Sequence, residues 1–196
     1  NGRWRLVIAS TLSISAQSLI RTPDGFLVNV SMPVTPNETG SSTVSFFNPA
    51  SNTEQQSFIR LVNTDAQSTA VTISGVDDAG QMAPNGDVSL TLAAGHSVEL
   101  SAADLEEGNS VLQLLGSLGT GSGRWRLHVA SDSAVSVVSY VLTSEGFLTN
   151  MSSVVGAAST SNTVWIFNPG SNANQVSKLR VINSGLSSAA VTVTGI

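Results

Sequence analysis

The sequence contains no cysteine, a single lysine and two histidines among its 196 residues. Without cysteine, neither a disulfide framework nor a thiolate metal site can form. The net charge is −5 and Lys178 is the only lysine. Because phosphate recognition needs clustered Lys and Arg, these values exclude a nucleic-acid partner. Only 11% of residues are charged, so the surface is kept soluble by Ser, Thr, Asn and Gly, which is common in secreted β-proteins.

Long apolar runs and catalytic motifs are also missing. Apolar stretches alternate with polar residues and stay below the roughly 18 residues that a membrane-spanning helix needs, so we expect no membrane span in this segment. No GxSxG elbow is present, and the two histidines, His96 and His128, fit a hairpin turn and an outer strand face. We therefore predict that the chain is not an enzyme and has no catalytic residues.

The sequence contains two copies of one repeated unit. Gly2–Leu6 and Gly123–Leu127 both read GRWRL, at an offset of 121 residues (125 − 4 between the tryptophans). The pair Asn48-Pro49 returns as Asn168-Pro169 at an offset of 120 (168 − 48), so one indel separates the copies. Residues 2–75 therefore match residues 123–195, and residues 76–122 occur once. Such repetition favours an architectural role over a single active site.

Turn-forming residues indicate where one repeat ends and the next begins. The stretch TPNETGSS at residues 35–42 is matched by GAASTSN at residues 156–162. Boundaries at these stretches divide the chain into three parts. Residues 1–36 are the C-terminal part of one repeat, residues 41–157 are a complete β-sandwich repeat, and residues 161–196 are the N-terminal part of the next repeat. The Gly-rich stretch at residues 116–123 is then a loop inside the complete repeat.

Alternating apolar residues predict β-strands. In the GRWRL strand, Trp125, Leu127 and Val129 face inward while His128 faces outward. The next strand turns Val135 inward, together with Val137 and Val141. Further strands are expected at residues 57–63, 70–75, 88–92 and 97–100, and one helical turn at residues 101–108 with Ser101 as N-cap. Seven or eight short strands in one period predict an all-β fold of tandem antiparallel immunoglobulin-like β-sandwich repeats.

Several segments together carry a family resemblance: FNPGSNANQVSKLRVIN, VDDAG, AGHSVELSAADLEEGN, GSGRWRL and TSEGFLTNM. They resemble a β-sandwich repeat of large secreted or surface-attached bacterial proteins, in which copies occur in series or beside hydrolase and adhesion domains. The resemblance covers the whole chain. It implies a unit that opens at the FNPGSN strand and closes after GFLTNM. It implies no catalytic residues, and no function is assigned to the repeat itself.

Two acidic clusters are candidates for a metal site, and calcium is the one cofactor that they suggest. Carboxylate oxygens are ligands that calcium prefers, although no EF-hand or RTX-type spacing is present. The alternative is that the aspartates form a turn and the glutamates keep an exposed segment solvated. The candidate ligands are Asp77, Asp78, Asp104, Glu106 and Glu107.

Two aromatic residues are candidates for binding a carbohydrate. Tyr140 and Trp165 have no aromatic counterpart in the other copy, where Leu19 and Ser45 stand, and both lie on the less apolar register of their strands. Exposed aromatics of this kind could form a sugar platform. Partial burial, or a contact with the neighbouring repeat, is the competing interpretation.

Together these features predict a non-catalytic structural repeat of an extracellular bacterial surface protein, acting as a stalk, a spacer or a fibre-forming subunit. Its partners would be neighbouring copies of the same repeat. The chain starts and stops in mid-period, and two hypotheses explain this: truncation of a longer array, or strand exchange between subunits in a filament. The alternative function is a carbohydrate-binding or adhesin module attached to a secreted hydrolase.

Overall fold

The computed structural model describes residues 19–21, 27–29, 41–152, 171, 177, 179–181, 183 and 188–194 of the chain. The chain divides into two units, Asn1–Val154 and Val155–Ile196. Nearly all of the regular secondary structure described lies in residues 41–152 of the first unit. In the described ranges, no helix has the length and apolar character needed to cross a membrane.

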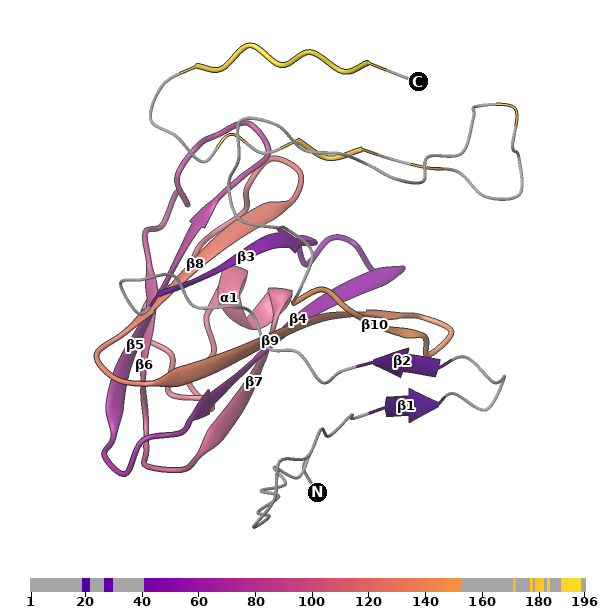
Figure 1. Cartoon of the computed structure of the whole chain (residues 1–196). Coiled ribbons are helices and arrows are strands. Elements are labelled where there is room, and N and C mark those ends of the chain that lie inside the picture. The colour runs from indigo at the N-terminus through magenta and orange to yellow at the C-terminus, as the bar shows by residue number, and fades with distance from the viewer. Residues whose placement is uncertain are drawn as a thin grey trace. The chain divides into compact units, whose positions relative to one another are not determined.

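Residues 41–152 form two four-stranded antiparallel sheets (Figure 1). The first, here called the β4–β9 sheet, has the order β10-β9-β4-β7. It contains β10 (Leu148–Asn150), β9 (Val135–Thr143), β4 (Gln55–Asn63) and β7 (Ser97–Ser101). The second, the β5–β8 sheet, has the order β3-β8-β5-β6. It contains β3 (Ser42–Phe47), β8 (Trp125–Ser131), β5 (Thr69–Val76) and β6 (Val88–Leu92). The predicted all-β character is confirmed.

One hydrophobic core lies between the two sheets and gives them a sandwich-like arrangement. Alternate residues along β5 and β6, and along most of β8, are buried, as expected for sheets with one face against a core. On β8, Trp125 and Leu127 are buried while His128 is exposed, which confirms the predicted register. On β9 the predicted inward residues are also buried. The largest fully buried side chains are Trp125, Phe47, Ile59, Leu61, Ile73, Leu100, Leu105, Leu118 and Leu127.

The Trp125 ring leaves little room for a side chain at two neighbouring positions, and both of these are glycine. A Cβ added to Gly75 would lie 3.0 Å from the Trp125 ring, and one added to Gly121 would lie 2.5 Å from it. The first distance is tight and the second is shorter than any side chain accepts. The indole therefore occupies space that these two glycines leave open.

The expected helical turn is present as α1 (Ala102–Glu107), directly after β7. Ser101 is its N-cap and forms a capping box with Asp104. The backbone N–H of Asp104 donates to Ser101 Oγ at 3.2 Å, and the N–H of Ser101 donates to Asp104 Oδ2 at 2.8 Å. The prediction of Ser101 as the N-cap is confirmed.

A separate two-stranded sheet joins β1 (Leu19–Arg21) and β2 (Leu27–Asn29). Its register pairs Leu19 with Asn29. At the offset of 121 residues these positions become Tyr140 and Asn150, which pair with each other between β9 and β10. The other two pairs of the hairpin correspond in the same way. Both copies of this sequence therefore form the same hairpin in the same register.

Candidate functional site

The acidic pair Asp77 and Asp78 lies directly after β5 and holds the Gly-rich loop that precedes β8. Asp77 Oδ2 accepts a hydrogen bond from the Ser122 N–H at 2.8 Å, and its Oδ1 accepts from the Gln81 N–H at 2.8 Å. Asp78 Oδ2 accepts from the Arg124 N–H at 3.0 Å. Backbone donors thus engage both carboxylates, which is the turn-forming role weighed against calcium.

The same hydrogen bonds set the protonation of Asp77. Slight burial raises the pKa of this carboxyl, but donors from the backbone of Ser122, Gln81, Ala79 and Gly80 outweigh that effect and bring the pKa below its ordinary value of 3.8. Asp77 is therefore an acceptor for the surrounding backbone at neutral pH.

The second acidic cluster lies on α1, and its three carboxylates have separate surroundings. Asp104 accepts from Ser101 and, through Oδ1, from Asn109 Nδ2 at 2.6 Å. Burial raises the pKa of Asp104, but these hydrogen bonds outweigh burial and lower the pKa overall. Glu106 is buried and its Oε1 accepts from Trp125 Nε1 at 2.7 Å, whereas Glu107 is exposed.

The described residues contain no group of three or more His, Cys, Asp or Glu side chains placed to hold a metal ion. The calcium candidates are divided between the turn after β5 and the helix α1, and four of the five side chains already accept hydrogen bonds from the protein. The geometry therefore offers calcium no assembled set of ligands in this part of the chain.

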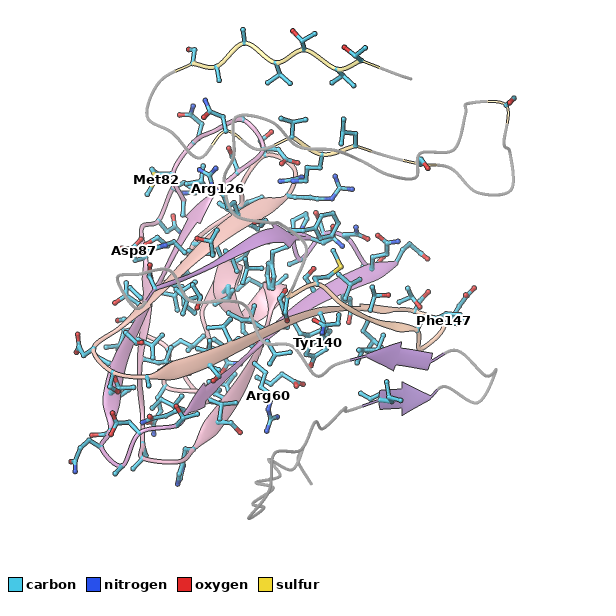
Figure 2. The ribbon with its side chains drawn as sticks, in the orientation of Figure 1. Arg60, Met82, Asp87, Arg126, Tyr140 and Phe147 are labelled. Carbon is cyan, nitrogen blue, oxygen red and sulfur yellow. The ribbon has the colours of Figure 1, made fainter. Side chains whose placement is uncertain are left out.

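Tyr140 lies on the outer face of the β4–β9 sheet and is only 4% exposed (Figure 2). Its ring stacks on Phe58 of β4 with the centroids 5.3 Å apart and the planes 13° from parallel. Its burial leaves no platform for a sugar ring. Trp165, the other aromatic candidate, lies outside the described residues.

The two histidines lie on different elements of the described surface. His96 and His128 are both exposed, the first in the turn between β6 and β7 and the second on the outer face of β8. One hollow in the described residues is lined by Pro49, Ala50, Asn52, Gln56, Ser57, Ser101, Ala102 and Ala103. None of these side chains titrates in the physiological range.

Sequence reasoning missed a group of buried polar residues at the ends of β3 and β4. Asn48 is completely buried. Its N–H donates to Ser57 Oγ at 2.8 Å, its Nδ2 donates to the Gln55 carbonyl at 2.8 Å, and its Oδ1 accepts from Arg124 Nε at 3.1 Å. We call Asn48, Ser57 and Arg124 the asparagine clasp. It ties β3, β4 and the start of β8 together.

Asn63, at the other end of β4, is a second buried connector. Its Nδ2 donates to the backbone carbonyls of Gln67, Leu92 and Ala93 at 2.7, 3.0 and 3.2 Å. Its Oδ1 accepts from the Asp65 N–H at 2.9 Å. One side chain thus joins the β4–β5 turn to the end of β6.

Comparing the two copies of the repeat would have identified these buried polar residues. The clasp is identical in the other copy, as Asn168, Ser177 and Arg3, and Asn63 returns as Asn183. Comparison with family models, curated proteins and solved structures finds no match for this chain.

Proposed function

We propose that this chain is a non-catalytic structural repeat of an extracellular bacterial surface protein, made of immunoglobulin-like β-sandwiches in tandem. It serves as a stalk, a spacer or a fibre-forming subunit, and its partners are neighbouring copies of the same repeat. The proposal rests on one observation, namely which residues recur in both copies of the repeat. The recurring positions are those that build the sandwich: the tryptophan core, the asparagine clasp and Asn63.

Two candidate ligand positions lie in the part of the sequence that both copies share, and neither recurs. Tyr140 is replaced by Leu19, and Trp165 by Ser45. A chain that repeats its scaffold gains length and surface from repetition. The burial of Tyr140 removes support from the carbohydrate-binding alternative, so we do not propose it as a second function.

The extracellular location rests on composition and on the family resemblance. The surface is polar and sparsely charged, and the motifs from FNPGSN to GFLTNM resemble repeats of secreted and surface-attached bacterial proteins. Immunogold electron microscopy of the source cells, with antibody raised against residues 41–152, tests this directly. We expect gold on fibres or stalks beyond the cell envelope. Gold confined to the cytoplasm, with pre-immune serum as control, would refute the proposal.

A further inference from the structure

The two sheets differ in the face that they turn away from the core. At the centre of the β5–β8 sheet this outer face is polar, because the positions between the buried residues of β5 and β8 are Thr72, Ser74, Arg126 and His128. Such a face needs no cover, since water can hydrate its side chains. The outer face of the β4–β9 sheet has the opposite character.

The register of β4, β9 and β10 places a group of apolar side chains together on the outer face of the β4–β9 sheet. Phe58 pairs with Tyr140, and Leu142 pairs with Leu148. These positions alternate with the core residues of β4 and β9, so they share the opposite face. β4 also contributes Arg60 to this face (Figure 2). We call the apolar members the outer apolar face: Phe58, Val62, Val138, Tyr140, Leu142 and Leu148.

Three members of the outer apolar face are buried although they take no part in the core between the sheets. Val62, Tyr140 and Leu148 are 8, 4 and 8% exposed, and the core cluster contains none of them. Phe58 stacks on Tyr140 from the neighbouring strand, but neighbours within one sheet shield each other only from the side. The other three members are partly exposed. An apolar face of this kind marks a contact with another layer of protein.

The β1–β2 hairpin provides such a layer. Its strand β2 contacts β10, the edge strand that contributes Leu148 to the outer apolar face. The hairpin is itself apolar and incompletely covered, because Leu19 is 48% exposed and Ile20 is 39% exposed. Closing the hairpin over the sheet would therefore remove apolar area from water on both surfaces.

We propose that the outer apolar face is the contact surface between consecutive repeats, and that its occupant is the β1–β2 hairpin of the preceding repeat. This rests on the proposed tandem arrangement and specifies how neighbouring repeats meet. The hairpin pairs in the same register as β9 and β10, its sequence equivalents in the complete repeat. Repeats joined through an apolar surface move as one body, so the array forms a stiff rod and not a flexible string of domains.

Tyr140 provides a test, because it is the only tyrosine in the sequence and its reactivity reports on the outer apolar face alone. Nitration of the full-length chain with tetranitromethane measures how accessible its ring is. In the hairpin variant, a Gly-Ser linker of equal length replaces residues 19–29. The matched control replaces residues 188–194 in the same way, a segment of the second unit with exposed Val191 and Val193. We expect the wild type and the control to be protected, and the hairpin variant to be nitrated about tenfold faster.

Circular dichroism checks that the two sheets stay folded in each variant. If the linker disturbs folding, the double variant Leu19→Asp with Ile20→Asp keeps the hairpin backbone and should show the same gain in nitration. Protection that persists in a folded hairpin variant would overturn the hairpin as occupant. Protection that falls on dilution would also overturn it, because the cover would then be a second copy of the chain.

A tyrosine that reacts readily in the folded wild type would show that the outer apolar face is open, and would overturn the contact itself. The spacer role would survive each of these results, because the immunogold experiment tests location independently of nitration.

Discussion

Asn63 illustrates how a single polar side chain can be stabilising inside an apolar core. It is fully buried, and its amide donates to three carbonyls from two different loops. Burying an amide is costly unless its hydrogen bonds are made, and here all of them are made within the protein. The side chain of Asn63 both donates to and accepts from backbone groups, and no other side chain of that size would make the same hydrogen bonds. This explains why asparagine recurs at the equivalent position, Asn183.

Replacing Asn63 by Ala should lower the free energy of unfolding by about 2 to 3 kcal/mol, because buried carbonyls lose their donor and a small cavity forms. Urea denaturation followed by circular dichroism measures this change. Gln67→Ala is the matched control, since Gln67 is exposed and contributes only its backbone carbonyl to Asn63. Equal stability of the two variants would contradict the role assigned to Asn63.

The ionisation of Asp77 makes the stability of the fold depend on pH. Backbone donors outweigh its slight burial and keep its pKa below 3.8, so the unfolded chain binds this proton more tightly than the folded one. The stability that Asp77 contributes is complete above the ordinary pKa and is lost as the pH falls through the lowered pKa.

In urea denaturation at a series of pH values, the stability difference between wild type and Asp77→Asn should therefore be largest near neutral pH. It should shrink as the pH falls from about 5 to about 2. A difference that stays constant over that range would show that the carboxylate charge contributes nothing at this position.

At the scale of elements, the helix α1 is joined to β8 through one buried hydrogen bond. Glu106 Oε1 accepts from Trp125 Nε1 at 2.7 Å, and both residues are buried. The indole can pack at the centre of the core because its only polar atom has this acceptor. The helix, which is less than two turns long, is positioned by this bond and by Leu105, which is completely buried.

Glu106→Leu should destabilise the fold by about 1 to 3 kcal/mol, because the Trp125 N–H would be left buried without an acceptor. Glu106→Gln keeps an oxygen in the same place and should retain most of the stability. Chemical denaturation measures both variants, and the tryptophan emission spectrum reports on the indole environment. If Leu proved as well tolerated as Gln, the hydrogen bond would not be what positions α1.

The elements that sequence predicted best are those with regular alternation. β8 and the first half of β9 alternate between buried and more exposed residues, so a period of two predicts both their existence and their faces. β3 has no periodic signal that would fix its bounds, since its register shifts between Val44 and Phe47 and its burial does not alternate. β10 has only three residues, too few for a periodic signal.

The burial of Tyr140 could not be predicted for a different reason. Its place on the outer face follows from the strand period, but its cover comes from Phe58 on the neighbouring strand β4. Strand pairing over such a long sequence separation leaves no trace in the local pattern. The clasp in contrast was readable in principle, because comparing the two copies exposes Asn48, Ser57 and Arg124 as unchanged.

At the scale of the whole molecule, residues 41–152 hold the two described sheets, and the flanking residues repeat part of their sequence. Residues 163–194 repeat the sequence of β3, β4 and β5, and residues 3–29 repeat that of β8, β9 and β10. The central claim is that this recurring sequence builds a two-sheet unit in which β5 and β8 pair in the register described.

Engineered disulfides test this claim most directly, because the natural chain has no cysteine to interfere. Ser74 pairs with His128 between β5 and β8. Cα atoms of such cross-strand partners lie within the range that a disulfide spans. The control pairs Ser74→Cys with Asp132→Cys, which is displaced from His128 by four residues, roughly 13 Å along a strand.

Under mild oxidation, the chain with Ser74→Cys and His128→Cys should form an intramolecular disulfide, seen as faster migration on a non-reducing gel, and the displaced control should not. A pair that stays reduced, or that forms its disulfide no faster than the control, would contradict the claim.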